Sequence, residues 1–240
     1  MTLTKYSDFQ EIFKDCLCYF PVVANGTSYL EAMNGYNGVI HGSVPLNVID
    51  RFGWKYTPNW ESQSTSNYIT VALTDKMSAT SQTIIAAIRP RALASNHPTA
   101  LSLHDGVGSA YGWDLTVGSD QFNIMLNTSA GDNLKQLIYT GSNPDWEIYA
   151  ISFSPTSMKL YKNGNLIASN TTAGTYVYTS TMNLNIGIDT PGTYYPFMGE
   201  IGEILLFTTE LTDLQIQTIY KIMATGYPQV LLSGGERGVY

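Results

Sequence analysis

Paired carboxylates are the first side chains to test for chemistry, because two of them placed about 5–9 Å apart across a sugar bond can cleave it. On a strand, acids at i and i+2 share a face, whereas acids three residues apart point to opposite faces. Asp145 and Glu147 have the first spacing, but Asp145 follows an Asn-Pro pair that predicts a turn. Glu200 and Glu203 have the second spacing. The sequence therefore favours a polar strand end over an active site.

The sequence gives little support for a metal site or a catalytic nucleophile. His41, His97 and His104 fall in or near predicted loops, without the Cys-x-x-Cys or His-Glu-x-x-His spacing of common zinc sites. No Gly-x-Ser-x-Gly motif marks a serine nucleophile. The glycine-rich segment 106–112 lacks a Lys and a following helix pattern, so it predicts a turn rather than a phosphate-binding loop. We therefore expect no enzymatic activity.

The elements that must position these side chains are mostly short strands. Thr, Val, Ile and aromatic residues recur in short runs that Gly, Asn, Pro and Ser clusters separate. Strands are predicted at 83–88, 101–104, 113–117, 122–126, 146–153, 158–161, 166–169, 184–188 and 201–207. The run 146–153 is apolar on both alternating faces, which indicates a strand covered on both sides, as in a sandwich.

A hairpin and two short helices accompany the strands. The Asn-Gly pair within residues 162–165 tolerates the positive φ angles of a type I′ turn and predicts a tight hairpin. Thr212 and Gln215 have the spacing of a capping box, and the apolar stripe after them predicts a helix that ends at Gly226. Residues 7–13 show the same pattern and predict a short helix near the N-terminus.

Composition excludes several classes of protein. The chain has 240 residues, 19 acidic and 12 basic side chains, and a net charge of −7. Such a chain matches a phosphate backbone poorly, so nucleic acid is not an expected partner. A hydrophobic content of 44% with 12% aromatic residues is too high for disorder. The apolar runs are far shorter than the about 20 residues that span a bilayer, so we expect no membrane insertion.

The cysteines and the N-terminus bear on where the chain folds. Cys16 and Cys18 are separated by one residue, so on a strand both would project from the same face, and a disulfide between them would strain the loop. The first 13 residues lack the apolar region and cleavage pattern of a signal peptide. We therefore expect synthesis and folding in the cytoplasm, without a disulfide.

The pattern as a whole predicts an all-β sandwich of antiparallel sheets with short helices near both termini. No composition shift or linker divides the chain. We therefore expect an N-terminal segment of residues 1–14 with a short helix, one sandwich domain of residues 15–226, and a C-terminal tail of residues 227–240.

Several of these segments, taken in order, resemble laminin G-like domains of the concanavalin A-like lectin/glucanase superfamily. The most specific is the Trp strand at 146–150, followed by a hairpin whose turn reads Tyr-Lys-Asn-Gly at 161–164. The other matching segments are 17–21, 34–39, 83–90, 186–187, 197–204 and 211–216. The resemblance covers about residues 15–224 and implies a jelly-roll sandwich of two curved antiparallel sheets. Gly202 departs from the pattern, because the family often has Asp there.

The resemblance also bears on sites. Glucanases of this superfamily carry a Glu-x-Asp-x-Glu type strand, and this chain contains no such run. Laminin G-like domains often bind Ca²⁺ through Asp, Asn and carbonyl oxygens in rim loops, so Ca²⁺ is the cofactor that the resemblance allows, without a defined ligand set. The loop or loop-adjacent acids that could contribute are Asp105, Asp114, Asp120, Asp132 and Asp189.

A sugar-binding surface is the remaining hypothesis, since aromatic rings stack on sugars beside short polar groups. The candidate contacts are an alternating Tyr pair, a Tyr pair in a nearby loop and two Trp residues of an aromatic-rich loop: Tyr176, Tyr178, Tyr194, Tyr195, Trp54 and Trp60. Tyr also packs on sheet surfaces because of its β-propensity, so packing within the fold is the alternative for the Tyr residues.

The leading functional hypothesis is a non-catalytic lectin-like module on a virion surface, as a head decoration or tail-fibre component that binds glycans through many copies. This hypothesis accounts for two observations together: the family mostly works outside cells, and this chain shows no secretion signal. Expected partners are glycans or other cell-surface ligands, other virion proteins and further copies of the chain. The alternative is a purely structural capsid decoration or cement protein, which adds residues 227–232 to a partner's sheet edge. A β-glycanase is the third hypothesis.

Overall fold

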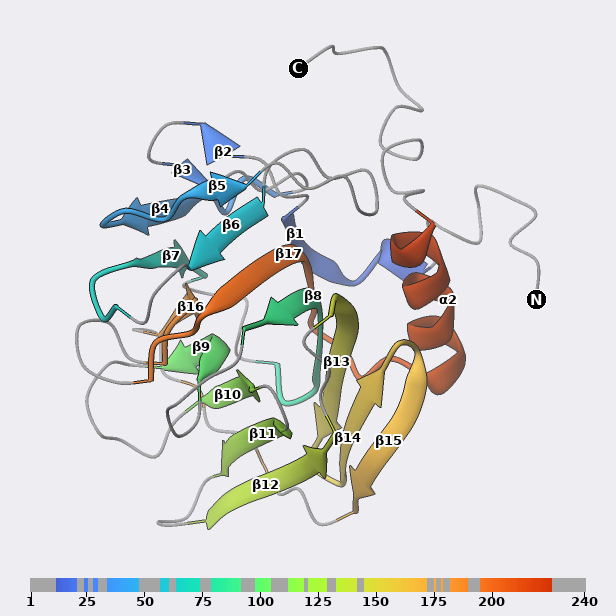
Figure 1. The fold of residues 1–240 in the computed structure, drawn as a ribbon. Coiled ribbons are helices and arrows are strands. Elements are labelled where there is room, and N and C mark those ends of the chain that lie inside the picture. Colours follow the sequence, from blue (N-terminus) through green and yellow to red (C-terminus); the bar gives the residue numbers. More distant parts are fainter. Residues whose placement is uncertain are drawn as a thin grey trace.

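Two antiparallel β-sheets pack face to face as a jelly-roll sandwich in the computed structural model of this chain, so the predicted all-β class is confirmed (Figure 1). The structure describes residues 12–20, 24–25, 28–29, 34–47, 57–60, 64–73, 79–91, 98–104, 112–118, 121–128, 133–141, 145–171, 175, 178, 182–189 and 195–225. None of the helices within these ranges is both long enough and apolar enough to cross a membrane.

Sheet A joins eight strands within the described ranges. Their order is β15 (Asn165–Asn170), β14 (Ser157–Lys162), β13 (Glu147–Ser154), β8 (Gln82–Pro90), β17 (Gly199–Phe207), β6 (Thr57–Trp60) and β5 (Leu46–Asn47), and β1 (Cys16–Phe20) also pairs with β17. The central pair, β8 and β17, brings together segments more than a hundred residues apart in the chain.

Sheet B joins nine strands, counted over the same described ranges. Their order is β12 (Asn133–Thr140), β11 (Gln121–Thr128), β10 (Trp113–Val117), β9 (Thr99–His104), β16 (Asn183–Ile186), β7 (Tyr68–Ala72), β4 (Gly38–His41), β3 (Ser28–Tyr29) and β2 (Ala24–Asn25). Each neighbouring pair for which the register is defined runs antiparallel.

The main hydrophobic core lies between the two sheets. On β13, Tyr149, Ile151 and Phe153 face this core, while Ile148 and Ala150 face the other side of sheet A, where a second cluster of buried side chains lies. The two apolar faces predicted for this strand are therefore confirmed. Sheet A is the central layer of the molecule, buried on both of its faces.

Helix α2 (Asp213–Ala224) covers the outer face of sheet A (Figure 1). Its buried stripe, which includes Ile216, Ile219 and Met223, packs on residues of β8 and β17. The predicted capping box is present, because the Thr212 side chain accepts from the Gln215 backbone N–H and the Gln215 side chain accepts from the Thr212 backbone N–H. The capping box fixes where α2 begins, and the buried stripe fixes which way it faces.

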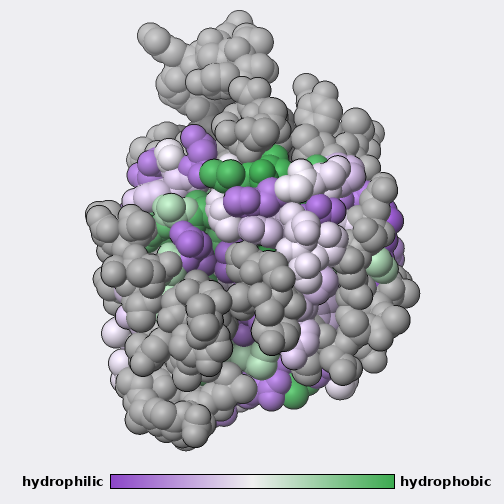
Figure 2. Space-filling view, turned by 90° about the vertical axis from the view of Figure 1, so that its left-hand side faces the viewer, coloured by the Kyte–Doolittle hydropathy of each residue, from purple (hydrophilic) through white to green (hydrophobic). Residues whose placement is uncertain are grey.

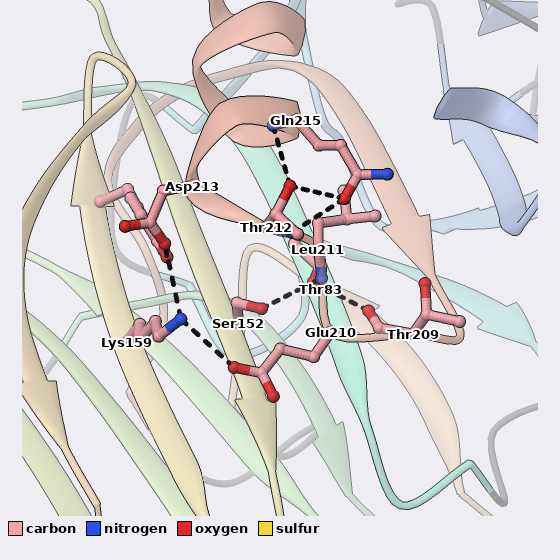
Figure 3. A network of polar contacts seen from close by, with 10 residues as sticks. Thr83, Ser152, Lys159, Thr209, Glu210, Leu211, Thr212, Asp213 and Gln215 are labelled. Carbon is pink, nitrogen blue, oxygen red and sulfur yellow. Dashed lines mark hydrogen bonds and ion pairs between the residues drawn. The ribbon is translucent and has the colours of Figure 1, made fainter. Parts of the chain in front are cut away.

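The start of α2 is tied to sheet A by a polar network centred on Thr83 of β8 (Figure 3). The Thr83 hydroxyl lies 2.9 Å from the Ser152 hydroxyl, donates to the Thr209 carbonyl over 2.9 Å and accepts from the Leu211 backbone N–H over 2.9 Å. Lys159 of β14 lies near the first turn of the helix, with ion-pair distances of 3.5 Å to Glu210 and 3.4 Å to Asp213. One buried hydroxyl thus sets the position of α2 on two strands.

Two further local predictions are confirmed where the structure describes them. The hairpin between β14 and β15 turns at Asn163 and Gly164, whose φ angles of 51° and 75° are both positive, as a type I′ turn requires. Near the N-terminus, Ile12 and Phe13 are helical and half-buried against the second cluster, and the Phe13 ring lies 5.9 Å from that of Phe207. The rest of the predicted N-terminal helix lies outside the described residues.

The expectation that Cys16 and Cys18 share one strand face is wrong. Cys18 belongs to the core between the sheets, whereas Cys16 belongs to the cluster on the other side of sheet A. The pairing of β1 with β17 shifts register between the two residues, and this irregularity turns one side chain to the opposite face. Both cysteines are buried and unbridged.

The expectation that Glu200 and Glu203 point to opposite faces is also wrong, for the same kind of reason. A register shift in β17 between Ile201 and Ile204 places both of these Ile side chains in the inner core although they are three residues apart. Glu200 pairs with Arg89, and Glu203 accepts from Tyr19 of the second cluster, so both carboxylates lie on the outer side of sheet A. Gly202 falls within this irregular stretch.

Candidate functional site

The outer faces of the two sheets differ in what they offer a ligand. The outer face of sheet A is covered by α2 and is apolar there. On the outer face of sheet B, the strands β7, β16, β9, β10 and β11 present mostly polar side chains in alternation with the core residues, while Val39, Met125 and Ile138 are apolar members of the same face. The polar ones are Thr70, Ser102, Asp114, Thr116, Asn123 and Asn185. We therefore take the outer face of sheet B as the candidate functional site.

A row of side chains crosses this face at right angles to the strands. The register places Thr70 beside Asn185, Asn185 beside Ser102, Ser102 beside Asp114 and Asp114 beside Met125. With strands about 4.8 Å apart, the row is about 19 Å long. Ser102, Asp114 and Asn185 are at most 5% exposed, while Thr70 and Met125 at its two ends are half-buried. The row is thus closed at its centre and more open at its ends.

The segment that follows β16 is tied down over this row. The Ser102 hydroxyl lies 2.6 Å from the Asp189 carbonyl and 3.1 Å from the Ile188 carbonyl, and can donate to either. The Asn185 amide donates to the same Asp189 carbonyl over 3.2 Å and to the Ser102 hydroxyl over 3.1 Å. These bonds use the donors of both side chains and leave the Asn185 Oδ1 without a described hydrogen-bond partner.

Three side chains of this face keep buried polar atoms that no described residue satisfies. They are the hydroxyl of Thr116, both amide atoms of Asn123 and the Oδ1 of Asn185. Thr116 and Asn123 are direct cross-strand neighbours, and they are 3% and 0% exposed. A buried polar group without a partner costs about 1–3 kcal/mol, so such a group needs an explanation. Together the atoms offer both donors and acceptors to a guest.

An aromatic pair stands beside the row on β4 and β7. The His41 ring stacks on the Tyr68 ring, with centroids 4.4 Å apart and planes inclined by 19°. The His41 Nε2 lies 2.8 Å from the Thr70 hydroxyl, which is the first member of the row. All three side chains are half-buried. Figure 2 shows the side of the molecule that carries sheet B, where hydrophilic side chains lie next to a group of hydrophobic ones.

The structure removes one predicted ligand contact. Trp60 is 1% exposed, its Nε1–H donates to the Asn67 carbonyl over 2.8 Å, and its ring meets the Phe197 ring edge-on in the core. The prediction that it binds a ligand is therefore corrected, because its ring is used in packing. Tyr178 is half-buried against the same core, in line with the packing alternative.

Tyr195 remains an accessible candidate. It is 41% exposed, has a positive φ of 50°, and its carbonyl accepts from the Thr99 backbone N–H at the start of β9. The remaining predicted contacts lie outside the described residues: Tyr176, Tyr194 and Trp54.

The calcium candidates are only partly described. Asp114 belongs to the polar row and Asp189 lies against Ser102, the neighbour of Asp114, so the fold brings these two acids to the same region. Within the described part of the chain, no group of three or more His, Cys, Asp or Glu side chains is placed to hold a metal ion. The other three acids that were candidates for binding calcium lie outside the described residues: Asp105, Asp120 and Asp132.

The carboxylates tested for glycoside cleavage are occupied in structural contacts. Glu147 is buried, accepts from the Tyr149 hydroxyl over 2.7 Å and pairs with Lys162 at 2.8 Å. Burial and the contact with Glu147 raise the pKa of Tyr149, so this hydroxyl stays protonated and donating. Glu200 is 1% exposed and pairs with Arg89 and Arg91. Neither carboxylate stands beside the polar row.

Sequence reasoning missed the side chains that form the row and the aromatic pair. A signal existed in β7, where Tyr68 and Thr70 alternate with the core residues Ile69 and Val71. A similar alternation runs through β10 and β11. Alternation identifies the outward face, but it does not tell which outward side chains become buried there.

The comparisons with known proteins address the fold. A laminin G family model, described as the concanavalin A-like lectin/glucanases superfamily, matches residues 63–217. The chain belongs to this superfamily. No curated protein matches it.

Solved structures share the lectin-like fold of this superfamily member. The binding domain of botulinum neurotoxin DC, in complex with rat synaptotagmin II, has a TM-score of 0.67 at 17% identity, covering 88% of this chain and 52% of that chain. A botulinum neurotoxin type C structure concerned with interaction with two ganglioside molecules has a TM-score of 0.68 at 18% identity, covering 89% and 52%. At these identities the likeness concerns the fold alone, and this chain spans about half the length of the neurotoxin chains.

Proposed function

We propose that this chain is a non-catalytic, lectin-like recognition module that binds glycans at the outer face of sheet B. The observations that carry the proposal lie on one face: the polar row, the unsatisfied amide and hydroxyl atoms of Thr116 and Asn123 on the neighbouring part of β10 and β11, and the stacked pair of His41 and Tyr68 at the Thr70 end of the row. Short polar groups next to an aromatic ring are what a sugar needs, because hydroxyls take the hydrogen bonds and the ring covers C–H surface.

Two further observations support a glycan site on sheet B and a function without catalysis. Because α2 covers the outer face of sheet A, sheet B is the sheet that presents a polar outer face. Glu147 and Glu200 are held in buried ion pairs away from that face, so they do not form the pair of free carboxylates that glycoside cleavage needs. One neurotoxin structure with this fold is a receptor binding domain, and another concerns the interaction of the toxin with two ganglioside molecules, which favours recognition over catalysis.

The test is glycan-array binding by the whole chain, followed by calorimetry on the strongest ligand. We expect Tyr68→Ala to weaken binding about tenfold, since a lost aromatic contact of about 1–1.5 kcal/mol changes affinity by that factor. Asn123→Leu removes both unsatisfied amide atoms, so it should abolish or weaken binding while stability stays equal or rises.

Tyr220→Ala is the matched control, because Tyr220 is a half-buried Tyr of α2 that packs beside the hairpin Gly164 on the other side of the molecule. It should leave affinity unchanged. Glycan binding that survives both Tyr68→Ala and Asn123→Leu, or that Tyr220→Ala removes, would contradict a site on sheet B.

Display on a virion surface stays a prediction, as does the assembly into multiple copies that would give weak sites avidity. Co-purification of the chain with sedimenting particles tests the first, and light scattering of the purified chain tests the second. The structural alternative depends on residues 227–240, which lie outside the described residues. Deletion of that tail should leave glycan binding intact if recognition is the function, and should abolish particle incorporation if the chain is a cement protein.

A further inference from the structure

Four neighbouring strands of sheet B, β9, β10, β11 and β16, carry no Lys or Arg. The sequence has no Lys or Arg between Arg91 and Lys135, and none between Lys162 and Lys221. Strands β9, β10, β11 and β16 fall within these two stretches. Among the described cations, Arg89 and Lys159 lie on sheet A among carboxylates, and Lys135 belongs to β12 at the edge of sheet B.

The same region carries negative charge. Asp114 is the fourth of the five residues in the row and is 5% exposed, and Asp189 lies nearby, since its backbone carbonyl accepts from Ser102 and Asn185 of the same row. The stretch from 92 to 134 contains four acids and no base, within a chain whose net charge is −7. An anionic ligand placed on this face would meet like charge in a partly desolvated place, where electrostatic repulsion is stronger than in water.

The side chains that remain for recognition are neutral and can both donate and accept. Amides of Asn and hydroxyls of Thr and Ser have both capacities, as sugar hydroxyls do. Thr116 Oγ1 and both amide atoms of Asn123 are unsatisfied among the described residues. A carboxylate ligand only accepts hydrogen bonds, so it would match half of this set, whereas a polyol matches all of it.

We propose that the ligand of this face is an uncharged oligosaccharide, and that the face discriminates against acidic glycans such as sialylated ones. This inference rests on the proposed function and narrows it to a class of ligand. It attributes the discrimination to Asp114 and to the four strands without Lys or Arg, and the recognition to the neutral amides and hydroxyls of the face.

The test compares pairs of oligosaccharides that share a neutral core and differ by one terminal sialic acid, such as lactose and sialyllactose, drawn from the neutral ligands that bind on the array. Calorimetry on the whole chain, in buffer with EDTA, is run at low salt and at high salt. At low ionic strength we expect the sialylated member to bind about three- to tenfold more weakly. At about 0.5 M salt the Debye length falls to a few ångströms, so the ratio of the affinities for the neutral and the sialylated member should shrink.

Asp114→Asn should also reduce the ratio of the two affinities, because it removes the charge of the row with little change of shape. Glu210→Gln is the matched control, since it removes one negative charge beside Lys159 on the side of sheet A. It should leave the ratio unchanged. If Asp114→Asn does not fold, the salt dependence of the unaltered chain decides.

The outcomes separate the two proposals. Sialylated members that bind as tightly as their neutral cores, or tighter, overturn this inference and leave glycan recognition standing. The inference is also overturned if the sialylated member binds more weakly but the affinity ratio responds neither to salt nor to Asp114→Asn. The exclusion would then be steric. An array on which no glycan binds overturns the proposed function itself.

Discussion

At the scale of single residues, the outer face of sheet B holds buried neutral side chains whose polar atoms no described residue satisfies. Thr116, Asn123 and Asn185 each keep a buried polar atom without a described partner, at about 1–3 kcal/mol for each such atom. A leucine at Asn123 would avoid this cost, so folding alone gives no reason for the amide. Recognition gives one, because a site that must bind polar groups gives up stability to present its own.

A second residue-scale feature is the close approach of backbone to ring at Gly187. Its φ is +86°, and a Cβ built there would lie 2.3 Å from the Trp60 ring. We predict that Gly187→Ala costs about 1–2 kcal/mol for the left-handed backbone. The overlap with a fully packed ring adds about 1–3 kcal/mol. Urea unfolding monitored by Trp fluorescence measures the sum.

Gly35→Ala separates the two causes. Gly35 has a similar φ of +77°, but nothing lies within 4 Å of the added Cβ. It should therefore show the backbone cost alone. Equal losses of stability in the two variants would mean that Trp60 yields to the new methyl group, and that the core around it is less tightly packed than the contact implies.

At the scale of elements, the first turn of α2 responds to pH. The Tyr161 hydroxyl donates to Asp213 Oδ1 over 2.7 Å, and this bond, together with Lys159, lowers the pKa of Asp213. A lowered pKa means that the folded state favours the carboxylate. Its contribution to stability is therefore present above the unfolded pKa of about 3.9 and is lost as the pH falls through the folded pKa.

We predict that the unaltered chain loses more stability than Asp213→Asn between about pH 5 and pH 2. The asparagine can still accept from Tyr161 but does not titrate, so the difference between the two curves isolates this carboxyl group. Urea midpoints measured across the range test this. Parallel curves would show that the contacts of Asp213 are too exposed to stabilise the start of α2.

The elements themselves were predictable where a local signal was strong. The Asn163-Gly164 turn, the Thr212 capping box and the two apolar faces of β13 all follow from residue types and spacing. The β17 irregularity did not follow, because one extra residue in a strand leaves the composition unchanged while it turns Glu203 to the other face. Strands such as β4, β6, β7 and β12 were not among the runs predicted from the sequence, although alternation of apolar and polar residues was present in β7.

The candidate site was much less predictable than the elements. Aromatic residues in loops pointed to Trp60, whose ring the fold uses in its core instead. The row from Thr70 to Met125 exists only because five strands from separate parts of the chain align in register. No local pattern encodes that alignment, so it can be read only from the pairing of the strands.

At the scale of the whole molecule, the sandwich has one sealed outer face and one polar outer face. Sheet A is apolar on both sides and depends on α2 to cover it, while sheet B presents neutral polar groups. This asymmetry makes α2 an integral layer of the fold rather than an appendage. The chain cannot unfold the helix without exposing the apolar surface around Phe207 and Leu205.

The last prediction tests that integration. Ile219 is 0% exposed between α2 and sheet A, so Ile219→Ala should cost about 2–5 kcal/mol of unfolding free energy. Leu214→Ala, on the exposed side of the same helix at 53% exposure, should cost no more than about 0.5 kcal/mol. Because α2 and the sheets share one buried cluster, far-UV circular dichroism and Trp fluorescence should report a single coincident transition in both variants. A separate early loss of helix signal in Ile219→Ala would show that sheet A stands without its cover.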